Sequence, residues 1–294
     1  MATDRDVMRH EEEIHGLDAL DIVLPAERPR RAAAIWSAAW PKLAAVAGVL
    51  AVWQIVVWTH WKPDFVLPSP STVFAELGHM AQTTEFWKAV VTTLRRALTG
   101  FGIAIVLGTA LGVAVSRSRI LRRAFGSFIT GLQSMPSIVW FPFAILLFKL
   151  SEGAILFVVV LGAAPSVANG LVSGVDHIPP VLLRAGRVLG ARGLANLRHV
   201  VLPAALPTYV AGLKQGWAFA WRSLMAGELI VIVASRPALG QQLQNARDLN
   251  RAPSLVAMML VIFTIGVLVD GLVFASVERS IRRLRGLVEV GTAA

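Results

Sequence analysis

The sequence has 294 residues, of which 55% are hydrophobic and 16% are charged, and its mean hydropathy is +0.64, which argues against a water-soluble domain. The formal net charge is +10, but arginines and lysines cluster in short segments between long apolar runs, a distribution typical of membrane proteins rather than nucleic-acid-binding ones. The absence of cysteine excludes disulfides, cysteine-ligated metal centres and thiol catalysis.

Apolar runs that approach the roughly 20 residues needed to cross a bilayer recur along the chain after residue 40. We expect residues 1–42 to form a cytoplasmic N-terminal tail and a membrane-surface elbow, because acidic residues stand where a signal peptide needs a basic end. The first span is predicted over 43–59. A proline-rich break follows it, and a short surface helix over 71–80 is expected, with Ser69 or Ser71 as its N-terminal cap.

The second span is predicted over residues 92–115. It carries Gly108 and Gly112, four residues apart. This small-xxx-small spacing lets helix backbones approach closely in a membrane, so we expect a tightly packed neighbour on this face.

The third span is predicted over residues 124–148 and contains Pro136 and Pro142. Prolines within a span leave backbone groups that neighbouring helices or water must satisfy. The helix is therefore expected inside the bundle or beside a cavity. Pro136 and Pro142 are candidates for shaping a gate beside Met135 on the translocation pathway, with a plain packing kink as the equal alternative.

The fourth span is predicted over residues 154–175, and the pattern then changes. Residues 176–207 are rich in arginine, glycine and proline and predict a large loop. The fifth span is predicted over 209–233, a polar loop over 234–253, and the sixth span over 254–277.

The distribution of positive charge predicts the orientation of these spans. With the N-terminus inside, the cytoplasmic segments hold sixteen lysines and arginines and the opposite loops six, or eight if Arg95 and Arg96 are counted. We therefore predict an all-α polytopic membrane protein of about six spans with both termini cytoplasmic. Its parts are a transmembrane domain over 43–277, a cytoplasmic loop over 176–207 within it, and a C-terminal tail over 278–294.

The loop contains residues 183–207, LRAGRVLGARGLANLRHVVLPAALP. We expect a helix over 184–189, a sharp turn at Gly190 and a second short helix over 194–202, ended by Pro203. This would be a helix–turn–helix-like knuckle with an apolar tip surrounded by arginines. The residues alone leave two interpretations open: a solvated loop held by membrane phosphates, or a docking element for a protein.

This stretch resembles the EAA loop of ABC importer permeases, in which Glu-Ala-Ala is followed after three residues by Gly and, about a dozen residues later, by Leu-Pro. The resemblance covers about residues 43–280. In the resemblance, the family's Glu falls on Arg184 and its second Ala on Gly186. In relatives that acid helps to orient the loop against the ATPase, so here the contact is absent, reversed in sign or supplied by the partner. The resemblance implies an ATPase-coupling segment, whose residues are Arg184, Ala185, Gly186, Arg187, Leu189, Gly190, Ala191, Leu202 and Pro203.

Other stretches resemble one subfamily, the permeases of nitrate, sulfonate and taurine type. They are LPSPSTV (67–73), TLRRALTGFG (93–102), MPSIVWFPF (135–143) and AWRSLMAGELI (220–230). Lys149 departs from the pattern, which usually has Gly after the preceding Phe.

The resemblance implies the type I ABC importer permease fold in the bacterial plasma (inner) membrane. The partners it implies are two copies of a cytoplasmic ABC ATPase, a second permease copy, an extracytoplasmic solute-binding protein and membrane lipids, with no nucleic acid. The solute would be small and anionic: a sulfonate, taurine, nitrate or similar. The chain has no G-x-x-x-x-G-K-[ST] phosphate loop, so ATP-Mg is expected only in the partner, and this chain is expected to have no catalytic residue, cofactor or metal.

An ionisable residue inside a span indicates a function until a structural partner is found. Arg222, near the middle of the fifth span, is predicted to line the pathway and attract an anion, because a guanidinium matches carboxylate or sulfonate geometry. The alternative is an internal pair with Glu228 or Asp270, or hydrogen bonds to backbone carbonyls. Glu228 is predicted near the outer mouth, with a gating or docking role, and Asp270 is predicted to have a structural hydrogen-bond or ion-pair role near the inner end of the sixth span.

Two other classes of protein remain as alternatives. An ATP-independent secondary transporter or channel often shows repeated halves, and the sequence contains no convincing internal repeat. A membrane scaffold that moves no solute is disfavoured by the proline-kinked spans and the charge of Arg222 within the fifth.

Overall fold

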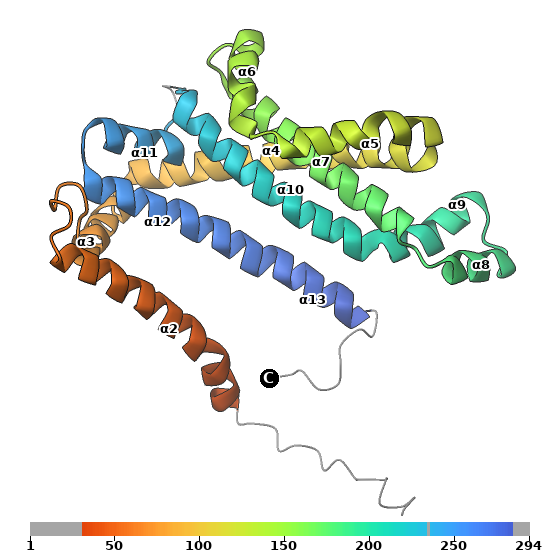
Figure 1. The fold of residues 1–294 in the computed structure, drawn as a ribbon, viewed down its shortest axis with the longest axis horizontal. Helices are drawn as coiled ribbons and strands as arrows, with labels where there is room; N and C mark the ends of the chain where they lie inside the picture. Colours follow the sequence, from red (N-terminus) through yellow and green to blue (C-terminus); the bar gives the residue numbers. More distant parts are fainter. Residues whose placement is uncertain (1–30, 234–235, 285–294) are drawn as a thin grey trace, which may run out of the picture. The chain divides into compact units, whose positions relative to one another are not determined.

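The computed structural model describes residues 31–233 and 236–284, which are helical over most of their length and contain no strand (Figure 1). Residues 1–30 of the predicted N-terminal tail and residues 285–294 of the predicted C-terminal tail lie outside the described residues. The described chain divides into two compact units between residues 52 and 53, and the second unit holds every helix from Pro70 onward. The longer helices are α2 (Arg31–Trp58), α4 (Thr84–Arg117), α5 (Arg119–Ser134), α7 (Glu152–Asp176), α10 (Leu202–Ile230) and α12 (Ala252–Val269). The shorter ones are α3 (Pro70–Ala81), α6 (Phe141–Phe148), α8 (Pro180–Val188), α9 (Gly193–Asn196), α11 (Leu239–Asp248) and α13 (Ala275–Leu284).

Four helical segments of the described chain are long and apolar enough to cross a membrane: Ala39–Trp58, α4, α7 and Ala252–Ile281, which runs through α12 and α13. A fifth candidate is α5 followed by residues 137–148, a pair bent by 103°. The remaining predicted span corresponds to α10, whose 29 residues are long enough. Lys214, Arg222 and Glu228 make α10 less apolar than the others, and neighbouring helices cover much of its surface.

Helix α7 packs closely between α4 and α10, and glycines make this packing possible. A Cβ atom at Gly108 would lie 2.6 Å from a backbone carbonyl oxygen of α7, and one at Gly112 would lie 3.0 Å from another. A Cβ at Gly170 of α7 would lie 2.6 Å from the Cα of Gly212 in α10. The close approach predicted for Gly108 and Gly112 is therefore confirmed, and a second glycine contact joins α7 to α10.

The apolar core lies among α4, α7 and α10. Phe101 meets Trp217 edge to face, with ring centroids 5.4 Å apart, and Trp217 stacks on Trp221 with centroids 6.1 Å apart. Leu224 is fully buried beside them. This core lies along the middle of α10, and each end of that helix carries a candidate functional site.

The predicted third span is bent more sharply than a kink. Met135 and Pro136 are extended, with ψ of 132° and 126°. Met135 leaves the helical region because it precedes a proline, whose ring disfavours that region for the residue before it. Helix α5 therefore ends at Ser134. Pro142 lies in the first turn of α6, where its missing N–H is harmless, so it helps to start a helix rather than break one.

The predicted end of the second short helix is wrong. Helix α9 runs through a π-helical segment, η2 (Leu197–Val201), directly into α10, so Pro203 does not end the second short helix. Pro203 lies in the first turn of α10, where a proline is tolerated. The predicted polar loop 234–253 contains α11, and helix continues past residue 277 as α13. By contrast, the cap predicted for the surface helix is confirmed, because the hydroxyl of Ser69 accepts the N–H of Thr72 at the start of α3.

Candidate functional site

The knuckle formed by α8, α9 and η2 has a defined turn. Helix α8 ends at Val188, and Gly190 takes a left-handed conformation with φ of 80°. The N–H of Ala191 donates to the carbonyl of Gly186 at 2.9 Å, and the N–H of Gly190 donates to that of Arg187 at 3.1 Å. These two bonds form a Schellman motif, in which glycine follows the helix because it alone adopts this conformation without strain.

The two arms of the knuckle pack through a second glycine. Gly186 is buried, and a Cβ there would lie 2.7 Å from Cγ2 of Val200 in η2. An alanine, which the family pattern places at this position, would push the arms apart unless Val200 moved. The departure at Gly186 therefore has a local physical reason, and the knuckle is held together by its own contacts.

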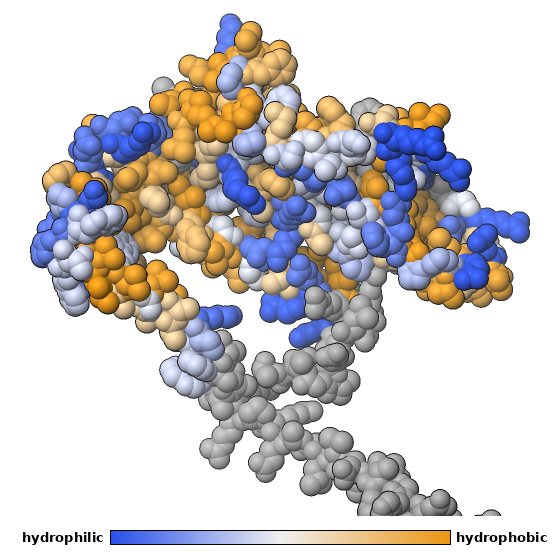
Figure 2. Space-filling model, in the orientation of Figure 1, coloured by the Kyte–Doolittle hydropathy of each residue, from blue (hydrophilic) through white to orange (hydrophobic). Residues whose placement is uncertain are grey.

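The tip of the knuckle is apolar and exposed, and its surroundings are basic. The side chains of Val188 and Leu189 are 87% and 85% exposed. Residues 178–207 contain no acidic residue, and their four exposed arginines are Arg184, Arg187, Arg192 and Arg198. Figure 2 shows hydrophobic and hydrophilic residues side by side where α8 and α9 project. Within the described part of the chain, Arg184 has no hydrogen bond or ion pair, while Arg187 donates to a carbonyl of its own helix at 3.3 Å.

The predicted coupling residues therefore fall into two groups. Those from Arg184 to Ala191 lie on one helix and its turn, and all except the buried Gly186 and half-buried Ala191 are exposed. Leu202 and Pro203 lie after η2, exposed in the first turn of α10. At the base of the knuckle, Arg122 of α5 pairs with Asp176 at the end of α7 at 2.6 Å. This pair commits the nearest preceding carboxylate to a different arginine.

At the opposite end of α10, Glu228 is buried and accepts several hydrogen bonds. Its relative exposure is 1%, and Arg96 Nη1 of α4 lies 3.1 Å from its Oε1. The hydroxyl of Thr93 donates to its Oε2 at 2.9 Å, and the N–H of Gly240 donates to the same oxygen at 3.1 Å. Thr93 in turn accepts the N–H of Leu239 at 3.0 Å. Glu228 therefore anchors the start of α11 to α4 and α10.

Two further charges complete this cluster. Arg96 Nη2 lies 3.2 Å from Glu152 Oε1, at the start of α7, and Arg236 Nη1 lies 2.8 Å from Glu152 Oε2. The two arginines and two glutamates alternate and sum to zero charge. Sequence reasoning missed this cluster, since it treated Arg96 as a possible loop charge. The signal that could have found it is Glu228 itself, because a glutamate within a membrane span is expected to pair with a cation, and the TLRRALTGFG stretch contains Arg96.

Arg222, the predicted anion ligand, is exposed and pairs with neither predicted acid. Its Nε donates to the carbonyl of Ala218 at 3.1 Å, and its guanidinium lies over the ring of Phe219 with 5.0 Å to the centroid. Its terminal nitrogens make no hydrogen bond among the described residues. Asp270 instead forms an ion pair with Lys214 at 3.5 Å, which agrees with the structural hydrogen-bond or ion-pair role predicted for it.

The other pathway candidates lie in different surroundings. Met135 and Pro136 are exposed at the break between α5 and residues 137–148. Glu228 is enclosed by its partners, so its carboxylate does not face an open surface of this subunit. The pathway role of Met135, Pro136 and Arg222 stays a prediction, while Glu228 has a structural role in the cluster.

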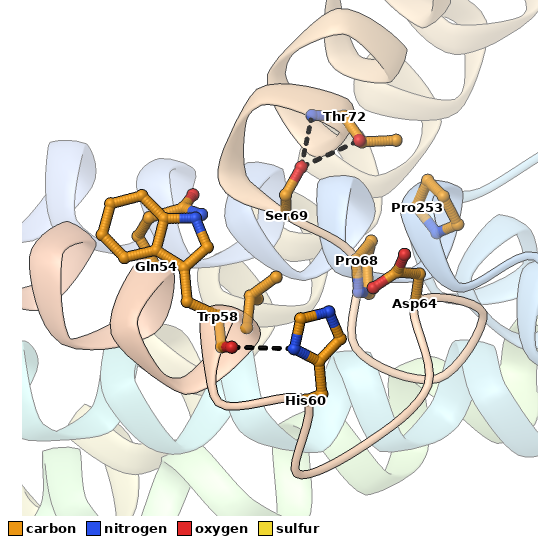
Figure 3. Close-up of a pocket in the computed structure, with 9 residues that line it drawn as sticks. Gln54, Trp58, His60, Asp64, Pro68, Ser69, Thr72 and Pro253 are labelled. Carbon is orange, nitrogen blue, oxygen red and sulfur yellow. Dashed lines mark hydrogen bonds between the residues drawn. The ribbon is translucent and has the colours of Figure 1, made fainter.

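A recess of about 350 Å³ lies near the last turn of α2 (Figure 3). Its lining includes Trp58, His60 and Asp64, with Ser69 at the start of α3. The Nδ1 of His60 lies 2.8 Å from the carbonyl of Trp58, and Ser69 is occupied as a helix cap. Among the described residues, no three histidine, aspartate or glutamate side chains gather closely enough to hold a metal ion.

Comparison with known proteins gives a family match. The model of the family described as binding-protein-dependent transport system inner membrane component matches residues 104–283. The aliphatic sulfonates transport permease protein SsuC of Escherichia coli, a putative assignment, is 29% identical over 223 residues, which are 76% of this chain and 84% of that protein. The taurine transport system permease protein TauC of Escherichia coli is 27% identical over 76% of this chain and 82% of its own.

Chains of solved ABC transporter structures have the same helical fold as this chain. A chain of the MetNI methionine ABC transporter in an inward-facing conformation superimposes with a TM-score of 0.57 at 21% identity, over 67% of this chain and 96% of that one. The all-α, type I importer permease fold predicted from the apolar runs and the family resemblance is therefore confirmed.

Proposed function

This chain belongs to the family of binding-protein-dependent transport system inner membrane components, in its nitrate-, sulfonate- and taurine-type subfamily, and from that premise we propose how it works. It is a membrane-spanning subunit of an ABC importer. We propose that residues 184–207 seat in a groove of a cytoplasmic ATPase, and that the chain lines half of the translocation pathway for a small anionic solute. ATP-Mg is bound and hydrolysed in the separate ATPase, of which two copies serve a permease dimer, and a solute-binding protein delivers the solute on the other side.

The observation that carries the coupling role is the exposed tip of the knuckle. A rigid, capped turn that exposes Val188 and Leu189 almost completely is costly in water, because apolar side chains gain free energy when a partner covers them. A preformed turn loses little conformational entropy on binding, so it suits a docking element. Closure of the paired ATPases would then be transmitted through the knuckle to α10, which continues from it without a break.

The orientation is supported by charge. At the knuckle end, the loops carry the arginines of residues 117–123 together with the four of the knuckle, whereas Asp176 is the acid beside them. An excess of arginine is expected on the cytoplasmic side of a membrane. The knuckle end would therefore face the cytoplasm, where the ATPase is.

The test of coupling is binding of the candidate ATPase to the purified chain. We expect Leu189→Asp to abolish co-purification, because it places a carboxylate in the apolar contact. Leu150→Asp is the matched control, since Leu150 is also exposed but lies in the turn between α6 and α7. If the ATPase binds the Leu189 variant as well as the wild type, the coupling role is wrong and an ATP-independent transporter or channel becomes the better interpretation.

The solute class is supported by Arg222 and by the relatives. The Arg222 guanidinium keeps its terminal nitrogens free, and sulfonates and carboxylates accept a planar pair of N–H donors. SsuC and TauC are named for the transport of sulfonates and taurine. We expect Arg222→Gln to lose uptake of labelled taurine, an alkanesulfonate or nitrate in proteoliposomes while ATPase binding is retained. Unchanged uptake of whichever of these the wild type transports would exclude Arg222 as an anion ligand.

A further inference from the structure

The positive charge of the knuckle indicates the charge expected on the ATPase surface that binds it. We propose that the ATPase groove that receives this knuckle presents a carboxylate opposite Arg184, beside an apolar floor for Val188 and Leu189. This inference rests on the proposed coupling function and deepens it. It makes Arg184 a specificity-determining residue, which selects an ATPase with an acidic groove and disfavours one whose groove is basic.

Within the described chain, no carboxylate balances the positive charge of the knuckle. Residues 178–207 contain no acidic side chain, and the nearest preceding carboxylate, that of Asp176, is held by Arg122 at 2.6 Å. In the described chain, the four arginines of the knuckle form no ion pair. The knuckle is therefore a surface of one sign, and the complementary surface is acidic.

Arg184 lies beside the apolar tip of the knuckle. Arg184 and Val188 are four residues apart on α8, so their side chains are neighbours on one face of the helix. A protein that covers Val188 therefore also touches Arg184. Arg187 already donates from its Nε to a carbonyl of its own helix, whereas Arg184 makes no such bond in the described structure. Arg184 is therefore an uncommitted cation on the same face of α8 as Val188.

Covering Arg184 with a protein that offers no acceptor for its guanidinium would cost free energy. A charge removed from water and left unpaired costs far more than an apolar contact of this size contributes. The groove that covers Val188 and Leu189 must therefore supply an acceptor for the guanidinium, and a carboxylate is the acceptor that pairs with it most strongly. An ATPase with a lysine or arginine at that place would be rejected by repulsion.

The experiment is a charge reversal in both proteins. Arg184→Glu should weaken ATPase binding by at least about tenfold at low salt, the loss expected for one close interfacial charge pair. Arg184→Gln should weaken it less and should reduce its salt dependence. Arg247→Glu, which reverses an exposed arginine on α11, is the matched control and should bind like the wild type. Arg184 makes no described contact, so the melting temperature of each variant should stay that of the wild type, which confirms folding.

Aspartates and glutamates of the ATPase are then reversed to arginine one at a time. We expect one reversal to weaken binding to the wild-type chain and to restore binding to the Arg184→Glu variant. If Arg184→Glu binds normally, or if no reversal restores it, the inference is overturned. Reduced binding of that variant to anionic lipid vesicles, with unchanged ATPase binding, would assign Arg184 to lipid phosphates instead. Loss of binding by Leu189→Asp alone would preserve the coupling function and reject only the charge pairing.

Discussion

The buried charge cluster at the far end of α10 allows a quantitative prediction for Glu228→Gln. The substitution keeps the shape of the side chain but removes its charge and turns one acceptor oxygen into a donor. Arg96, only 5% exposed, would keep Glu152 as its carboxylate, and Glu152 is shared with Arg236. An amide nitrogen in place of Oε2 could accept neither of the hydrogen bonds that converge there, from Thr93 and the backbone of α11. In place of Oε1 it would face the N–H donor of Arg96 instead.

The expected loss follows from these contacts. Removing one partner of a buried ion pair costs roughly 3–5 kcal/mol, and the retained oxygen places Glu228→Gln near the lower end, at about 3 kcal/mol. For a chain of this size, 1 kcal/mol corresponds to roughly 2–4 °C, so the melting temperature should fall on the order of 10 °C. The double variant Arg96→Gln/Glu228→Gln should lose less than the sum of the single variants, by about 1–3 kcal/mol, because its two sites interact directly.

The assay is thermal unfolding of the purified protein in detergent, followed by tryptophan fluorescence. Glu278→Gln is the control, since it makes the same chemical change in a half-exposed residue 3.7 Å from Lys214 and should cost less than about 1 kcal/mol. If Glu228→Gln melts at the temperature of this control, the cluster does not stabilise the fold. Additive losses in the double variant would show that the two residues act separately.

Two further predictions concern the backbone. Lys149 has φ of 58° and ψ of −163°, a region of backbone conformation essentially restricted to glycine. Lys149→Gly should therefore raise the free energy of unfolding by about 1–2 kcal/mol, whereas Lys149→Ala should not. Equal melting temperatures for both variants would contradict the backbone strain. A Cβ at Gly212 would lie 2.5 Å from the Cα of Gly170, so Gly212→Val should force α7 and α10 apart and cost more than about 3 kcal/mol, seen as loss of the monodisperse peak in size-exclusion chromatography. Gly102→Val, on an open face of α4, should leave that peak unchanged, and equal behaviour of these two variants would argue against the close glycine contact.

Several helices, a turn and a helix cap could be predicted from the sequence because the residues that determine them are close together in the chain. The apolar runs predicted α7 within two residues at each end, and they placed α4 and α12 with one end about eight residues off, since the removal of apolar side chains from water defines a span but not its helical extensions. The spacing of Gly190 and the preceding helix predicted the knuckle turn, because glycine is the residue that takes a left-handed conformation without strain. A serine before a proline-initiated helix predicted its cap correctly.

Local signals also misled where a long-range context decided the outcome. Pro203 was expected to end a helix, but it lies in a first turn that follows the π-helical segment η2, where its missing N–H does no harm. Helix α11 was missed because it is polar, and its N-terminus is fixed by Glu228 and Thr93 rather than by an apolar face of its own. The glycine of the family pattern at Lys149 marked a backbone conformation that the sequence alone did not reveal.

By itself, then, the sequence determined that this chain crosses a membrane several times, belongs with importer permeases and carries an arginine-rich knuckle. Only the tertiary structure decided which charges meet. Arg96 and Glu228 are 132 residues apart, and their contact depends on how α4, α7 and α10 are rotated and displaced along one another. That register is set by the glycine contacts between backbones, and hydrophobic periodicity reports which residues avoid water without reporting which side chains face one another.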